Sequence, residues 1–164
     1  GLVAVAEHQD RAVNNAPRIG DCRIFLSPFG RTNLPTMLDD GTLVLRANLD
    51  TYVRNEQCVS GAAVLRFKDG GFSSVVRPGD IVPGTTESRF GNIELLGVTA
   101  AYAVLVSATL ETPTGNFRPE TRWSYWLFPA EGPARLIALQ GEEILVGDSS
   151  ETFGENQNNQ SLES

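Results

Sequence analysis

LVLRANL, at residues 43–49, has a counterpart 61 residues further along the chain, VLVSATL at residues 104–110. Both segments consist mainly of Leu, Val and Ala, and apolar side chains fall on consecutive positions rather than on alternate ones. Short apolar runs of this kind, bounded by turn residues, indicate β-strands. Because consecutive side chains of a strand point to opposite faces, we expect each sheet to be apolar on both faces.

The similarity extends well beyond these two segments. Phe-Gly dipeptides occur at residues 29–30, 90–91 and 153–154, with spacings of 61 and 63 residues. The segment RPGDIVPGT at residues 77–85 resembles QGEEILVGD at residues 140–148, and each leads toward the next Phe-Gly. So many matches in one register indicate an internal duplication.

Each copy reads as four short strands joined by turns. Asp39-Asp40-Gly41 is a strong turn signal because Asp and Gly tolerate a positive φ, whereas Ala100-Ala101-Tyr102 in the copy lacks that chemistry. No stretch has a sustained period of 3.6 residues with capping signals, so we expect almost no helix. The expected strands are residues 33–38, 42–49, 62–67 and 72–77 in the first copy, and 93–98, 103–110, 123–128 and 134–140 in the second.

We therefore predict an all-β fold of two tandem four-stranded antiparallel repeat units that resemble propeller blades. The predicted boundaries are residues 1–28 for an N-terminal strand and loop from a preceding repeat, 29–89 and 90–152 for the two units, and 153–164 for a polar tail. Two blades cannot close a ring, since propellers need roughly 4–8, so this interpretation requires an oligomer. The alternative is a single β-sandwich, which would keep the chain monomeric.

Composition limits the classes of function. The 164 residues carry a net charge of −7, which argues against a nucleic-acid-binding protein, and no apolar run is long enough for a membrane span. Cys22 and Cys58, the only cysteines, are compatible with one disulfide in an exported protein or with two separate buried thiols. With His8 as the only histidine, we expect no metal site of the zinc type.

The pattern Gly-Asp-x-x-Pro-Gly-Thr at residues 79–85, followed by Phe-Gly at residues 90–91, resembles the repeats of large exported bacterial proteins of unassigned function. This motif consists of turn residues and contains no catalytic signature. The resemblance implies a secreted or cell-surface location and a propeller-like repeat. It implies no activity, and we expect no cofactor.

The segment around Arg122, Trp123 and Tyr125 is the most aromatic part of the chain and the candidate ligand-binding site. In a strand Trp123 and Tyr125 share one face and Trp126 points to the other. If exposed, these side chains would suit a glycan or protein partner; if buried, they fill the core.

Turn carboxylates such as Asp39, Asp40 and Asp80 leave a carboxylate hydrolase as the remaining enzymatic possibility. Carboxylates in turns usually bind local backbone amides, so we expect no enzyme and no catalytic residues. The function that the sequence favours is an exported structural protein that self-associates into an oligomer or an extracellular filament through its repeats. The alternative is a lectin-like binding module.

Overall fold

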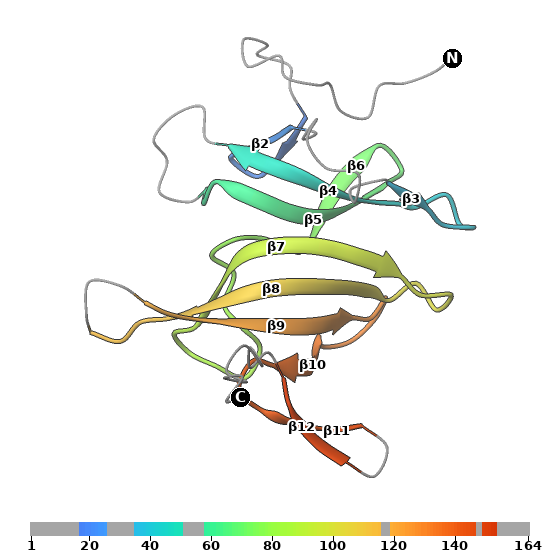
Figure 1. The fold of residues 1–164 in the computed structure, drawn as a ribbon. Coiled ribbons are helices and arrows are strands. Elements are labelled where there is room, and N and C mark those ends of the chain that lie inside the picture. Colours follow the sequence, from blue (N-terminus) through green and yellow to red (C-terminus); the bar gives the residue numbers. More distant parts are fainter. Residues whose placement is uncertain (1–16, 26–34, 51–57, 116–118, 147–148, 154–164) are drawn as a thin grey trace, which may run out of the picture.

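The computed structural model describes residues 17–25, 35–50, 58–115, 119–146 and 149–153 (Figure 1). These residues form antiparallel β-structure, and none of them is helical, so the described chain has no helix that would cross a membrane. The first sheet (sheet 1) contains β1 (Arg18–Ile19), β2 (Cys22–Phe25), β3 (Thr36–Met37), β4 (Leu43–Asp50), β5 (Gly61–Lys68) and β6 (Gly71–Val76). The second sheet (sheet 2) contains β7 (Arg89–Val98), β8 (Val104–Thr112), β9 (Glu120–Phe128) and β10 (Arg135–Leu139), and β11 (Glu143–Val146) and β12 (Ser149–Thr152) form a hairpin.

The all-β prediction is confirmed, and β3 to β10 correspond to the eight strands expected from the sequence. In sheet 1, β3, β4, β5 and β6 follow one another as neighbours, and β7 to β10 do the same in sheet 2. The predicted 61-residue register is visible in the ladders. Leu45 pairs with Leu65 between β4 and β5, and Val106 pairs with Trp126 at the equivalent place between β8 and β9.

The turn before the central strand of each sheet has the same geometry in both copies. The Gly41 N–H donates to the Leu38 carbonyl at 3.0 Å, and 61 residues later the Tyr102 N–H donates to the Thr99 carbonyl at 2.9 Å. Gly41 has a φ of 80° and Tyr102 a φ of 61°. The second copy keeps this turn although it lacks the Asp and Gly residues, because Tyr102 adopts the positive φ despite its Cβ.

Two further strands complete sheet 1 beyond the four expected. Residues 18–25, predicted as part of an irregular loop, form β1 and β2, and β2 pairs with the end of β4 at Asp50, Leu49 and Asn48. In sheet 2 the equivalent part of β8 pairs with the start of β7, at Arg89 and Phe90. The end of β4 thus pairs with β2, which lies outside the first unit, whereas the end of β8 pairs with β7, which belongs to the second unit. The hairpin of β11 and β12, at the end of the predicted second unit, was not among the expected strands.

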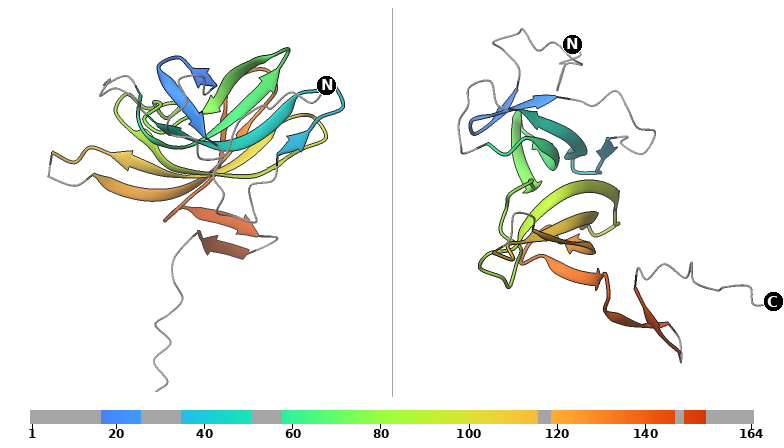
Figure 2. Two further views of the ribbon diagram at one scale, coloured as in Figure 1. Left: turned by 90° about the horizontal axis from the view of Figure 1, so that it is seen from above. Right: turned by 60° about the vertical axis from the view of Figure 1, so that its left-hand side comes forward.

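The main core lies between the two sheets. Val44, Val64 and Val76 come from sheet 1, and Val104, Val106, Ala108, Leu110 and Trp126 come from sheet 2. Two arginines of sheet 1 bond across the junction. Arg46 Nε donates to the Ile93 carbonyl at 2.9 Å, and Arg66 Nη2 donates to the Pro129 carbonyl at 3.4 Å. Sheet 1, sheet 2 and the final hairpin follow one another along the molecule (Figure 2).

The two sheets pack through faces that are not equivalent. Val106 is the counterpart of Leu45, yet Val106 faces sheet 1 while Leu45 faces away from sheet 2 into a separate cluster. Sheet 2 therefore places its Val106 face on the Val44 face of sheet 1. Contact between unlike faces of similar units is a head-to-tail arrangement.

The first end of this stack is closed. Sheet 1 curls so that its edge strand β1 lies beside its other edge strand β6. Ile24, Leu45, Ala63 and Leu65 are buried inside this curl, together with both cysteines. The Leu45 face is thus covered by strands of its own sheet, which leaves sheet 2 as the end where the described stack stops.

Candidate interaction surface

Strand β9 divides its aromatic side chains between the two faces of sheet 2, as the alternation predicts. Trp126 is 3% exposed and packs edge-on against Phe90 in the main core, with ring centroids 5.4 Å apart. Its indole Nε1 donates to Ser124 Oγ at 2.9 Å, and Ser124 Oγ donates to the Ala108 carbonyl at 2.8 Å. Trp126 is therefore a core residue with a satisfied polar group.

Trp123 and Tyr125 lie on the opposite face, together with Leu105 and Leu127 (the Leu105 face). Trp123 is 45% exposed, and Tyr125 is half-buried. The Tyr125 ring packs edge-on against Phe153, with centroids 5.2 Å apart. Neither residue fills the core between the sheets, so the side chains of the predicted site remain available at the surface of the described chain.

The predicted trio does not converge on one point. Arg122 is anchored to Gln140. Arg122 Nε donates a hydrogen bond to the Gln140 backbone carbonyl at 2.9 Å, and Arg122 Nη2 donates to the same oxygen. Gln140 holds Trp123 as well, because its Oε1 accepts from the Trp123 backbone N–H at 3.0 Å. Gln140 was missed at the sequence level, since a glutamine at a strand end has no distinctive signal. Arg122 thus serves to fix β10 to β9 rather than to flank Trp123.

The contact between Tyr125 and Phe153 repeats an internal feature of the stack. The Gly79 N–H donates to the Phe90 carbonyl at 2.7 Å, and the Phe90 N–H donates to the Asp80 carbonyl at 3.0 Å. Gly141, Phe153 and Glu142 make the same pair of bonds, at 2.8 and 3.0 Å. After each sheet the chain therefore makes the same turn. The phenylalanine of the next Phe-Gly then packs on the sheet just completed: Phe90 lies in the core with the Val44 face of sheet 1, and Phe153 contacts Tyr125 on the Leu105 face of sheet 2.

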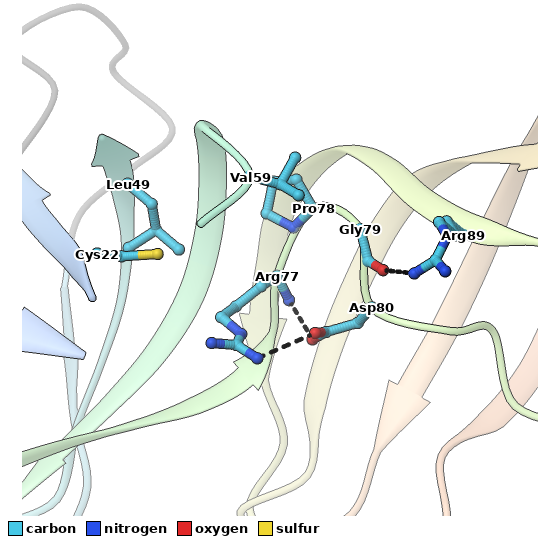
Figure 3. Close-up of a pocket in the computed structure, with 8 residues that line it drawn as sticks. All are labelled: Cys22, Leu49, Val59, Arg77, Pro78, Gly79, Asp80 and Arg89. Atoms are coloured by element: carbon cyan, nitrogen blue, oxygen red, sulfur yellow. Dashed lines mark hydrogen bonds and ion pairs between the residues drawn. The ribbon is translucent and has the colours of Figure 1, made fainter. Parts of the chain in front are cut away.

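A cavity of about 210 Å³ lies beside the first of these turns (Figure 3). Asp80 closes one side of it by accepting from the Arg77 backbone N–H at 2.8 Å and from Arg77 Nη2 at 3.3 Å. Arg89 Nη1 donates to the Gly79 carbonyl at 2.7 Å. These charged groups bond to one another and to the backbone, so the arrangement holds the turn between β6 and β7.

A second cavity of about 260 Å³ lies on the other side of Gly79 and Pro78. Gly61, Asn92 and Glu111 contribute to its lining, and Val59 and Arg89 are common to both cavities. Neither cavity was foreseen from the sequence, because they form where the two repeat units meet. Their polar groups provide hydrogen-bonding positions without a nucleophile and base in contact.

The predicted disulfide between Cys22 and Cys58 is present, with the two Cα atoms 5.4 Å apart. It ties β2 to the residues that precede β5, at the rim of the first cavity. Both cysteines are buried against Leu49 and its neighbours in the sheet 1 cluster. The disulfide therefore fastens the strand that completes sheet 1 to the rest of that sheet.

Asp40 forms an ion pair with Lys68 at the surface. Its carboxylate accepts from Lys68 Nζ at 2.7 Å and from the Thr42 N–H at 2.9 Å. These bonds, with that of the Lys68 ammonium the largest, lower the pKa of Asp40 to about 2 and raise the pKa of Lys68. Among the described residues no three His, Cys, Asp or Glu side chains gather as a metal site would require.

His8, the expected strand at residues 2–7 and residues 154–164 of the polar tail lie outside the described residues. Comparison of the chain with protein-family models, with curated proteins and with solved structures finds no match in any of the three.

Proposed function

We propose that this protein is an exported structural protein that self-associates through its repeat sheets. The observation that supports it most strongly is that the two duplicated sheets pack through apolar faces and sheet 2 keeps further apolar side chains exposed. A contact between chains would differ from the packing of sheet 2 on sheet 1, because sheet 1 encloses its Leu45 face, the counterpart of the Val106 face, within its own curl. The protein's working parts would then be its sheet surfaces and edges rather than a catalytic cleft.

The exposed apolar side chains support this proposal. Seven large apolar side chains of the described residues are exposed, and four of them belong to sheet 2: Leu96, Trp123, Leu136 and Ile137. Sheet 1 contributes one, Met37, and encloses its Leu45 face within its own curl. Leu136 and Ile137 are adjacent on β10, and exposed apolar residues that lie together commonly mark contact surfaces. We therefore place the assembly contacts at the sheet 2 end of the molecule.

Export is the second part of the proposal, and the disulfide between Cys22 and Cys58 supports it. Structural disulfides form and persist in oxidising compartments and are rare in the reducing cytosol. A secreted or cell-surface location also agrees with the resemblance of residues 79–91 to repeats of exported bacterial proteins.

Sedimentation velocity of the oxidised protein at high concentration tests self-association. We expect a species heavier than the 17.7 kDa chain, formed reversibly. A single species of one chain at the highest soluble concentration would overturn the proposal.

A lectin-like binding module remains the second candidate, favoured by the exposure of Trp123 beside the Tyr125 and Phe153 pair. Flat aromatic rings at a surface stack well on apolar faces of partners. Titration of the protein with a panel of soluble oligosaccharides, followed by tryptophan fluorescence, tests this candidate. A saturable change that disappears in Trp123→Phe would support it, and no change with any sugar would reject it.

A further inference from the structure

The face of sheet 1 that receives sheet 2 has an equivalent in sheet 2, and that equivalent is accessible. Val44 and Val64 lie beneath sheet 2 and are 0% exposed. Their counterparts 61 residues later are Leu105 and Tyr125, which lie on the Leu105 face and are only half-buried. Trp123, on the same face, is 45% exposed. The positions that a neighbouring sheet buries completely in sheet 1 thus stay accessible in sheet 2.

The chain already places on the Leu105 face the residue with which a next sheet would start. Phe90, near the start of β7, is 2% exposed, and its N–H donates to the Asp80 carbonyl at 3.0 Å. The Phe153 N–H makes the same bond with the Glu142 carbonyl at 3.0 Å, and its ring contacts Tyr125. Phe153 is only half-buried. Phe153 therefore has the place on sheet 2 that Phe90 has on sheet 1, but without a covering sheet from the described residues.

The start of sheet 1 provides a third example of the same step. The Ile24 N–H donates to the Pro17 carbonyl at 2.9 Å. Ile24 pairs with Leu49, and Phe90 pairs with Leu110, which lies 61 residues after Leu49. Ile24 and Phe90 thus occupy the same ladder position in their sheets. Two of the three steps lead into a sheet, and the third is the one on the Leu105 face.

We propose that the Leu105 face is the docking surface for a third sheet of the same repeat type, whose first strand carries Phe153 as β7 carries Phe90. The argument is continuity with the junction already present, because stacked repeats bury a continuous core that no single unit can bury alone. The inference goes beyond the proposed self-association. A second copy of the described chain cannot repeat this junction, since its Leu45 face is enclosed and its Val106 face lies on its own sheet 1.

The Leu105 face fits an apolar partner surface better than a charged one. Across the existing junction, Arg46 and Arg66 of sheet 1 donate to backbone carbonyls of sheet 2. Their counterparts on the Leu105 face are Ser107 and Leu127, which carry no charge. Apolar side chains from two sheet faces pack together in such a contact. The third sheet is therefore recognised by a face of apolar side chains such as the Val106 face.

A chain extended after Gly154 by a copy of residues 92–153 tests this docking. The copy replaces residues 155–164, and its two tryptophans are changed to phenylalanine. Trp123 and Trp126 then remain the only tryptophans, as in the unextended chain. Trp126 is 3% exposed, so quenching by acrylamide reports on Trp123. We expect the extension to abolish most of the quenching of Trp123 and to shift its emission to shorter wavelength.

Leu105→Lys in the extended chain is the disrupting variant. A lysine there would be buried without a partner by a docked sheet, and Leu105 points away from the main core. We expect this variant to restore the quenching of the unextended chain. Circular dichroism of unextended Leu105→Lys checks that sheets 1 and 2 still fold. Met37→Lys is the control, because Met37 is 65% exposed on β3 of sheet 1, and it should leave Trp123 protected.

Four results would overturn the inference. The appended unit folds while Trp123 stays as quenchable as before, or it stays unfolded beside intact sheets 1 and 2. The protection of Trp123 survives Leu105→Lys. Trp123 becomes protected in the unextended chain at high concentration, which would assign the face to a second copy. Self-association is judged separately from the mass of the unextended chain, so each proposal can fail while the other stands.

Discussion

Gly91 shows at the scale of one residue why the repeat carries a Phe-Gly dipeptide. The Asn92 N–H next to it donates to Thr109 Oγ1 of the neighbouring strand at 2.8 Å. A Cβ on Gly91 would stand 2.6 Å from that oxygen and would also meet the Glu111 carboxylate. The glycine is thus favoured because the Thr109 and Glu111 side chains of β8 pack against this position, and the phenylalanine before it fills the core.

Gly91→Ala should therefore destabilise the protein by about 1–3 kcal/mol, the usual cost of forcing atoms into a filled site. Gly97→Ala is the control, because Gly97 lies in the same strand and its Cβ would meet nothing within 4 Å. We expect that variant to stay within about 0.5 kcal/mol of the wild type. Urea unfolding measures both, and equal stability of the two variants would contradict the explanation.

Asp40 yields a prediction about pH. Its pKa of about 2, against an ordinary value of 3.8, results mainly from the bond with Lys68, the only lysine of the chain. Because the pKa is lowered in the folded state, this contribution to stability is complete above pH 3.8 and is lost as the pH falls toward 2. An NMR titration should place the Asp40 carboxyl near 2 in the wild type and closer to 3.8 in Lys68→Met. The same value in both proteins would show that the pair is not formed in solution.

At the scale of elements, the sequence predicted β3 to β10, whose apolar residues mark them as strands. The positions of the central strands β4, β5, β8 and β9 were predicted within one to three residues. The short strands β1 and β2 were missed because their pairing depends on the edge that β4 offers. Strands of two and four residues are too short for their hydrophobic periodicity to reveal such a pairing partner.

In the aromatic segment too, features set by the local sequence were predicted and contacts between distant residues were not. Alternation along a strand predicted that Trp126 and Trp123 lie on opposite faces, and β9 has this arrangement. The bond from Arg122 to Gln140 and the contact of Tyr125 with Phe153 were not predicted. Each joins residues that are adjacent only after β10 has paired with β9 and the chain has made its next turn.

The disulfide between Cys22 and Cys58 leads to a prediction about the stability of the protein and of β2 in particular. It closes a loop between residues 36 positions apart, which corresponds to about 4 kcal/mol in the chain-entropy estimate. The double variant Cys22→Ser and Cys58→Ser should lose most of that amount in free energy of unfolding. Hydrogen exchange should show the loss first in β2, since β2 is the strand that the disulfide fastens. Unchanged stability in guanidinium unfolding would contradict this role.

The whole molecule is a short stack of similar sheets with one end closed. Sheet 1 encloses its Leu45 face, sheet 2 rests on the other face of sheet 1, and Phe153 returns to the Leu105 face after the second turn. Each step uses the same turn and the same register. The duplication in sequence thus explains the direction of the stack, whereas the closure of sheet 1 comes from a segment outside the repeat.

The mass of the oxidised protein in solution, measured by light scattering over a dilution series, tests self-association most directly. We expect a mass that rises above 17.7 kDa at high concentration and returns to that of one chain on dilution. A mass of 17.7 kDa at every concentration would contradict it.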